Sequence, residues 1–259
     1  MANQNAFNIF KFLLAHPLTR GLSVDDASTT TLRRQIVRQK KFLKQIYHEW
    51  YRRIIEHLPT EGSVLEIGSG AGFFSEISPR VITSEIFPTP GVDLIADGRH
   101  LPFVDGGLVA ITMTDVLHHM VEVESFFSEA GRCVRSGGAM VMIEPWRTTW
   151  SEWVYRNLHP EPFEPSFGWD VSDTGILSSA NGALPWIIFE RDRERFEREF
   201  PEWEIKLIEP MMPVAYLLSG GISLRALAPS LSYKIVRWLE RVFGESRFAM
   251  FALIVLTRR

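Results

Sequence analysis

The chain has 259 residues, of which 46% are hydrophobic and 23% charged, and a formal net charge of −3. This composition is ordinary for a globular protein, and without an overall basic surface a nucleic-acid partner is not expected. The one cysteine, Cys133, excludes an intrachain disulfide framework, and no apolar run approaches the roughly 20 residues of a membrane span, so a cytoplasmic protein is expected.

The first 58 residues are predicted to form a helical cap that packs on a sheet and on its ligand cleft. A short helix is expected over 7–14, ended by Pro17. From Leu32 to Ile54 apolar residues fall at helical spacing, with arginine and lysine between them. The basic character of this segment leaves an alternative open, an amphipathic surface that contacts a membrane.

The stretch from Val64 to Phe74 predicts a strand, a tight turn and the start of a helix. Glu66 lies in the apolar strand, and the glycines after it let a ligand approach the backbone closely. Their spacing is Gly-x-Gly-x-Gly, and Phe73 stands where a dinucleotide-binding turn has its last glycine. An NAD-dependent oxidoreductase is therefore the weaker alternative. The turn contains Gly68, Ser69, Gly70 and Gly72.

Further strand-like runs follow, and most of them end at polar residues. Val81–Glu85 ends in a carboxylate about 20 residues after Glu66, where it can accept hydrogen bonds from ribose hydroxyls. The run 92–98 is next, and Leu108–Thr114 is typical of a buried strand. A fifth strand is expected over 139–144, after a glycine turn.

Residues 148–187 differ from the preceding core because they are rich in tryptophan and proline. We expect a loop-rich aromatic insert that acts as a substrate lid. The following charged segment, 191–200, carries phenylalanines on one side and is predicted to be a helix that ends before Pro201.

The carboxyl-terminal part is predicted to complete the sheet. Charged and apolar residues alternate over 202–208, which indicates a half-exposed strand. The segment 223–243 is predicted to be mostly helical with an interruption at Pro229, and 248–256 is predicted to be the last strand. The apolar run 211–224 is expected to pack in the core, with a substrate pocket or a lipid contact as alternatives.

The order of these signals resembles class I S-adenosylmethionine (AdoMet)-dependent methyltransferases of the small-molecule, type 11-like group. The motifs are the glycine turn led by Glu66, the acidic ends of the next two runs, the segment Asp115–Met120 and the turn at 135–138. The resemblance implies an α/β fold: a Rossmann-like seven-stranded mixed sheet with an antiparallel last strand, helices on both faces, a helical cap and an aromatic insert. The implied divisions are 1–58 (cap), 59–147 (AdoMet-binding core), 148–200 (lid and helix) and 201–259 (closing strands and helix).

The resemblance also implies AdoMet as the cofactor. Glu66 would reach the methionine amino group, Glu85 the ribose and Asp97 the adenine. The expected cofactor-binding residues are Glu66, Gly68, Ser69, Gly70, Gly72, Glu85, Ile86, Asp97, Gly98, Asp115 and His118.

A hydroxyl acceptor needs a base, and histidine suits this role because its unperturbed pKa is about 6.5. The candidates are His159 in the insert, His118 after the fourth strand and Glu144 at the end of the fifth. Each histidine has a structural alternative, packing against the cofactor or starting a helix. No recognisable metal-ligand spacing is present, so metal-independent transfer is expected.

Residues 14–21 and 181–186 resemble segments of bacterial methyltransferases of surface-polysaccharide synthesis. This implies a sugar hydroxyl, on a small molecule or a glycan, as the acceptor. The alternatives are a lipid or quinone acceptor, with the protein peripheral to the inner membrane, and a non-catalytic AdoMet-binding interaction protein. No oligomeric state follows from the sequence.

Overall fold

The computed structural model describes residues 27–70, 72–159, 161–170 and 179–259. The helix expected over 7–14 lies outside these residues. Within the described ranges, no helix combines the length and the apolar character needed to cross a bilayer.

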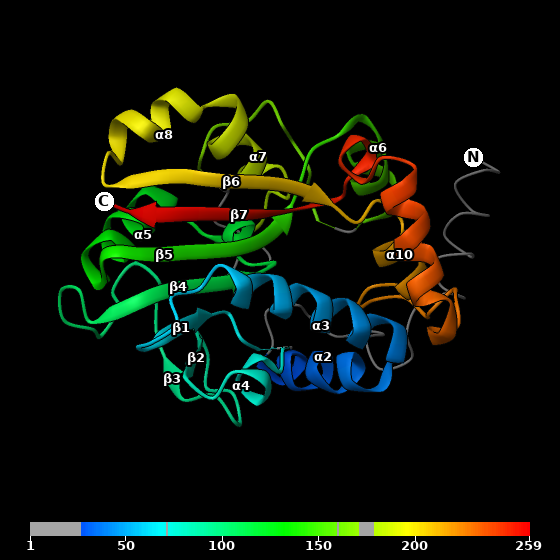
Figure 1. Cartoon of the computed structure of the whole chain (residues 1–259), viewed down its shortest axis with the longest axis horizontal. Coiled ribbons are helices and arrows are strands. Elements are labelled where there is room, and N and C mark those ends of the chain that lie inside the picture. Colours follow the sequence, from blue (N-terminus) through cyan, green and yellow to red (C-terminus); the bar gives the residue numbers. More distant parts are fainter. Residues whose placement is uncertain (1–26, 71, 160, 171–178) are drawn as a thin grey trace.

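A seven-stranded sheet with the order β3-β2-β1-β4-β5-β7-β6 forms the centre of the molecule (Figure 1). The first five strands in this order run parallel, and β7 is antiparallel to both β5 and β6. This confirms the Rossmann-like fold with an antiparallel last strand. The strands are β1 Val64–Ile67, β2 Val81–Glu85, β3 Leu94–Ile95, β4 Leu108–Thr114, β5 Val134–Pro145, β6 Trp203–Met211 and β7 Phe251–Arg258.

The central strands form because they are mostly apolar and rich in β-branched residues. All four residues of β1 are buried, as are six of the seven in β4, which is expected of parallel strands covered on both faces. β6 lies at the edge, where Pro210 does not interrupt the ladder because only one side of the strand is paired.

Helices cover both faces of the sheet. Trp50 packs on Phe251 of β7, with ring centroids 4.9 Å apart. The indole of Trp203 in β6 donates to the carbonyl of Phe127 at 3.3 Å. Trp203 is paired with Arg258 of β7, so the two side chains lie on the same face of the sheet. Side chains alternate between the faces along a strand, and Phe251 is seven residues from Arg258, so Phe251 lies on the opposite face. The contact of Trp50 and the contact of Trp203 are therefore on opposite faces of the sheet. The helices are α2 Ala27–Gln39, α3 Lys41–Glu56, α4 Phe74–Ile77, α5 Val123–Cys133, α6 Thr149–Leu158, α7 Leu184–Trp186, α8 Arg193–Glu199, α9 Ala215–Ser219 and α10 Tyr233–Val242.

The segment from Leu32 to Ile54 is helical as expected, but it forms two helices, because a break at Lys40 separates α2 from α3. Lys40 adopts extended backbone angles, and its ammonium group donates to the carbonyls of Gly221 and Leu224. Burial lowers the pKa of Lys40 to about 8. The break therefore follows from a long-range contact that helical periodicity does not record.

Two expectations are corrected. The aromatic insert begins with α6 instead of loop, and a capping box between Thr148 and Ser151 starts this helix. Residues 223–229 are not helical; α10 begins at Tyr233, after a 3-10 turn at Ser230–Ser232. A helix does not continue through Pro229, because a proline disfavours the helical conformation of the residue before it. Helical structure begins only after this residue.

Candidate active site

Acidic residues meet at the carboxyl edge of the parallel strands, the place where open α/β sheets bind ligands. Glu85 ends β2, Asp115 follows β4, and Glu144 is the second-last residue of β5. Asp115 has a left-handed φ of 63°, a conformation uncommon outside glycine. Such local strain is found where the surrounding structure fixes a functional side chain.

The glycine turn is held by its neighbours on β1 and β2. The hydroxyl of Ser69 donates to the carbonyl of Glu66 at 3.1 Å. The carboxylate of Glu85 accepts from the backbone N–H of Gly70 at 2.7 Å and from that of Ile86 at 3.2 Å. Glu85, expected to bind ribose, thus also anchors the turn.

Two of the glycines are required by sterics. Gly68 has a φ of +68°, and a Cβ there would lie 2.6 Å from Val116. A Cβ on Gly70 would lie 2.2 Å from the Glu85 carboxylate and 2.4 Å from Thr30 of α2. At Gly68 and Gly70, therefore, only a residue without a side chain fits against the neighbouring elements.

Glu66 is buried, and its Oε2 has no hydrogen-bond partner among the described residues. Burial raises the pKa of Glu66 to about 7, partly offset by a hydrogen bond to Ser69. A small pocket beside the turn is lined in part by Glu66, Ser69, Gly72 and Arg34. A buried carboxylate oxygen with no partner fits the ammonium group of a bound amino acid moiety.

We expect S-adenosylhomocysteine affinity to rise with pH between 5.5 and 7, by up to about tenfold per unit, because ligand binding requires ionised Glu66. At pH 7 the carboxylate is about half ionised, and this contribution becomes constant about one pH unit higher. Titration calorimetry across this range measures it. Glu66→Gln should abolish the pH dependence, whereas Glu56→Gln, on the exposed end of α3, should retain it. A pH-independent affinity of the unaltered protein would contradict the assignment.

The two residues expected to bind adenine, Asp97 and Gly98, already have close neighbours within the protein. The carboxylate of Asp97 is paired with Arg99 at 2.7 Å, and this contact is the main cause of a lowered pKa of Asp97. Gly98 lies close to the ring of Phe126, since a Cβ there would be 3.2 Å from it. The role of Asp97 and Gly98 in adenine binding stays a prediction.

A second group of residues surrounds His118, which is buried at the end of β4. Its Nδ1 lies 2.9 Å from Oε2 of Glu144, whose other oxygen accepts from the backbone N–H groups of Val116 and Leu117 at 2.8 Å. Its Nε2 lies 3.5 Å from Glu161 and 4.0 Å from Asp115. Two of the candidate bases, His118 and Glu144, are therefore brought into direct contact.

The electrostatics of this cluster favour positive charge at its centre. Burial lowers the pKa of His118, but hydrogen bonds to Glu144 and Glu161 and the charge of Asp115 outweigh it and raise that pKa well above its usual value. His118 in turn is the main cause, against the effect of burial, of a lowered pKa of Glu161. Three carboxylates thus surround one imidazole.

His159 lies beside this cluster, next to Glu161. Its Nδ1 accepts from the backbone N–H of Glu161 at 3.3 Å, and its ring meets Tyr155 edge-on with centroids 5.7 Å apart. A second pocket connects these residues: its walls include Tyr155, Phe163, Tyr216 and Phe251, and its polar lining is Asp115, His159 and Glu161.

Sequence reasoning missed Glu161 and Arg34. Glu161 stands two residues after His159 in the run His-Pro-Glu-Pro, and this unusual grouping of a histidine and an acid between prolines is a signal that could have identified it. Arg34 donates to the carbonyls of Gly70 at 3.0 Å and Pro90 at 2.7 Å. No local pattern distinguishes Arg34 from the other basic residues of α2.

Comparison with known proteins identifies the family of this chain. A family model described as a methyltransferase domain matches residues 39–201, more than half of the chain. A search of curated proteins finds no match.

Solved structures with a similar fold include AdoMet-dependent methyltransferases. Geranyl diphosphate C-methyltransferase from Streptomyces coelicolor, crystallised with Mg²⁺, geranyl diphosphate and S-adenosylhomocysteine, superposes with a TM-score of 0.53 at 14% identity, covering 95% of this chain and 90% of that one. A methyltransferase from Archaeoglobus fulgidus gives 0.54 at 14% identity, over 83% and 94%. One from Thermotoga maritima gives 0.52 at 15% identity, over 88% and 99%. At these identities the likeness establishes the fold.

Proposed function

Because this chain belongs to the methyltransferase-domain family and is an AdoMet-dependent enzyme, we propose that it methylates a hydroxyl group of a small molecule or glycan. The observation that carries the proposal is the cluster of His118, Glu144 and Glu161 beside the second pocket. Family membership sets aside the oxidoreductase and the non-catalytic interaction protein.

AdoMet supplies an electrophilic methyl group, so the protein mainly has to bind, orient and exclude water. In our proposal Glu66 pairs with the ammonium group of the cofactor, and Glu85 and the glycine turn hold its ribose and methionine portions. The carboxylates of Asp115 and Glu161 receive the proton that the acceptor hydroxyl loses, and the imidazole of His118 between them holds them in position. Glu144 fixes the imidazole through Nδ1, so Nε2 is directed toward Asp115 and Glu161.

The residues that line the second pocket would suit an acceptor that carries a ring. Tyr155 stacks on Phe163 with centroids 4.7 Å apart and an angle of 13° between the rings, and Tyr216 and Phe251 form another wall. Aromatic faces pack well against the C–H faces of sugars and other rings, while the carboxylates at the polar end accept hydrogen bonds from hydroxyls.

The test is methyl transfer from labelled AdoMet to matched acceptors. Pairs of compounds that differ only in having a hydroxyl, a methyl ether or a hydrogen at one position separate O-transfer from C-transfer. Label incorporated only into the hydroxyl member supports the proposal. Label retained by the compound in which the hydroxyl is already a methyl ether would place the transfer elsewhere and refute it.

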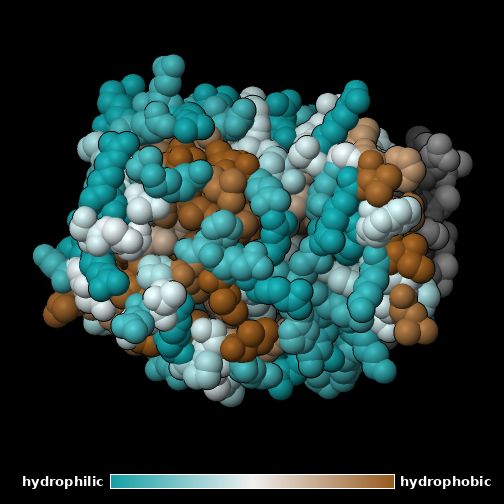
Figure 2. Space-filling model, viewed as in Figure 1, coloured by the Kyte–Doolittle hydropathy of each residue, from teal (hydrophilic) through white to brown (hydrophobic). Residues whose placement is uncertain are grey.

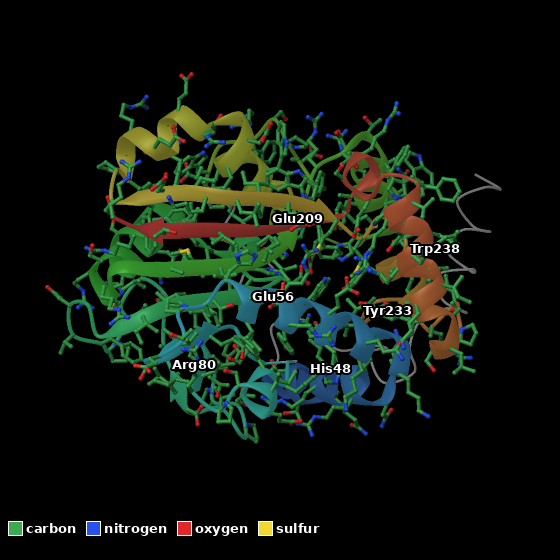
Figure 3. The ribbon with its side chains drawn as sticks, in the orientation of Figure 1. His48, Glu56, Arg80, Glu209, Tyr233 and Trp238 are labelled. Atoms are coloured by element: carbon green, nitrogen blue, oxygen red, sulfur yellow. The ribbon has the colours of Figure 1, made fainter. Side chains whose placement is uncertain are left out.

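A second candidate, a lipid-linked acceptor at a membrane surface, is favoured by α10. This helix presents its charged side inward: Arg237 is buried and pairs with Glu49 at 2.7 Å and Glu245 at 2.6 Å, and also with Glu240. Figure 3 labels Tyr233 on the side that faces α3 and Trp238 on the outer side. Several large apolar residues in and beside this helix are exposed, and Figure 2 shows hydrophobic side chains over this part of the molecule. They are Leu231, Ile235, Trp238, Leu239, Val242 and Phe243.

The charges around this face point to an anionic membrane as its occupant. Every exposed charged residue between 223 and 248 is a cation, whereas the two acids of that segment face Arg237. The exposed cations are Arg225, Lys234, Arg241 and Arg247. A helix with one apolar face, an interfacial tryptophan and flanking cations is typical of peripheral binding to anionic lipids.

We expect the protein to float with vesicles that contain anionic phospholipid and to bind much less to neutral vesicles or at high salt. Replacing both Trp238 and Phe243 by serine should weaken binding about tenfold or more, because each buried ring contributes about 1.5–3 kcal/mol. Val104→Ser removes an equally exposed apolar side chain outside α10 and is the matched control. Absence of flotation of the unaltered protein would rule out the membrane candidate.

A further inference from the structure

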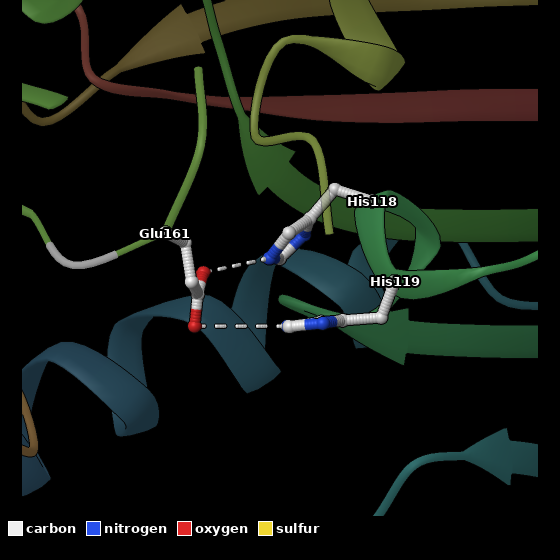
Figure 4. Close-up of side chains that lie close together, drawn as sticks. All are labelled: His118, His119 and Glu161. Atoms are coloured by element: carbon white, nitrogen blue, oxygen red, sulfur yellow. Dashed lines mark ion pairs between the residues drawn. The ribbon is translucent and has the colours of Figure 1, made fainter. Parts of the chain in front are cut away.

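His118 and His119, from the short turn that follows β4, both face Glu161 of the insert (Figure 4). Nε2 of His118 lies 3.5 Å from one oxygen of Glu161, and Nε2 of His119 lies 4.0 Å from the other. One ligand atom from each of the three residues falls within 4.8 Å of the others. From this geometry we propose that His118, His119 and Glu161 bind a divalent transition-metal cation.

The hydrogen bonds of the two imidazoles fix which ring nitrogen faces the carboxylate as an acceptor. Nδ1 of His119 lies 3.1 Å from the carbonyl of Ser179, which can only accept, so His119 carries its proton on Nδ1. With its proton on Nδ1, the neutral ring presents a lone pair on Nε2. That lone pair faces an oxygen of Glu161, another acceptor.

Two facing acceptors need a group between them that both can bind, and a metal cation is one such group. A proton on Nε2 of His118 can satisfy its own contact with Glu161, but it leaves the contact between His119 and Glu161 unsatisfied. A divalent cation satisfies both contacts at once, because each ligand atom donates an electron pair to the same ion.

The surroundings have the form of a metal site. A histidine that binds a metal through one ring nitrogen usually donates a hydrogen bond from the N–H of the other to a carboxylate or a backbone carbonyl. Here the acceptor is Glu144 for His118 and the carbonyl of Ser179 for His119. Metal–ligand bonds of about 2.0–2.2 Å put neighbouring ligand atoms roughly 3–4 Å apart, close to the separations found. Asp115, 4.0 Å from Nε2 of His118, is near enough to be a fourth ligand.

The donor set selects the class of metal. Two imidazoles and a carboxylate suit Zn²⁺, Mn²⁺, Fe²⁺ or Co²⁺, whereas Mg²⁺ and Ca²⁺ prefer oxygen alone. This departs from the expectation of metal-independent transfer. The inference also rests on the proposed function in one respect: Glu161 and Asp115 line the second pocket, so a cation there would hold the acceptor oxygen.

The test uses full-length protein stripped with a chelator, without AdoMet or acceptor. Titration calorimetry with Zn²⁺ and with Mn²⁺ should find one bound equivalent. Glu161→Gln and His119→Gln should each weaken binding at least tenfold, since each removes one ligand. Glu164→Gln, in the same loop but outside the cluster, should bind as the unaltered protein does. Thermal unfolding of each variant confirms that it is folded.

Unaltered protein that binds neither ion, or binds them equally well with Glu161→Gln, would overturn the metal site. S-adenosylhomocysteine binding is measured on the same samples. If it persists while metal binding is absent, the metal inference fails and the proposed function stands; if hydroxyl methylation fails while stoichiometric metal binding persists, the proposed function fails alone.

Discussion

Replacing Gly70 by valine is expected to reduce S-adenosylhomocysteine affinity by about 100-fold or more, a loss of roughly 2.7 kcal/mol. A Cβ at this position would lie 2.2 Å from the Glu85 carboxylate and 2.4 Å from Thr30, so the substitution must displace both. Glu85 would then lose its contact with the backbone N–H of Gly70. Because the turn and the proposed ribose-binding carboxylate move together, little of the cofactor site should remain.

The matched control for this change is Gly168→Val. No atom lies within 4 Å of a Cβ built at Gly168, so the same gain in volume is accommodated without displacement. Calorimetry should give unchanged affinity for this variant, and circular dichroism should establish that both variants are folded. Since Gly70→Val strains the fold, Glu85→Gln is a second probe that keeps the side-chain shape. Unchanged affinity in both Gly70→Val and Glu85→Gln would refute the assignment.

His118→Asn should lower kcat by about 10²–10⁴, the usual contribution of general-base catalysis, because the carboxylates of Asp115 and Glu161 lose the imidazole that positions them. Asparagine can still donate a hydrogen bond to Glu144, so the turn after β4 should be preserved. Affinity for S-adenosylhomocysteine should change little, because the altered group faces Glu161 and Asp115. Single-turnover rates with a hydroxyl acceptor separate this effect from product release.

His57→Asn, at the carboxyl end of α3, repeats the same chemical change away from the cluster and should leave kcat unaltered. A structural role of His118 would instead appear as a lower unfolding temperature with kcat nearly unchanged. That result would exclude His118 from the proton transfer.

Local patterns in the sequence were sufficient for the central fold. The alternating glycines after Glu66 and the apolar runs that end in acids depend on interactions within a few residues, and these runs became β1, β2 and β4. The apolar run expected over 248–256 is found at Phe251–Arg258, as the antiparallel strand between β5 and β6. Strand ends were the least accurate part, because pairing with neighbours sets them.

By itself the sequence thus determined the methyltransferase fold and the glycine turn, since both are written in short-range spacing. Tertiary structure alone decided three further features. Lys40 breaks the amino-terminal helix because carbonyls of a distant loop bind its ammonium group. The apolar side of α10 faces outward because Glu49 and Glu245 hold Arg237 inside. Glu161 joins His118 because the insert folds back over the end of β4, and no local periodicity encodes contacts between residues so far apart.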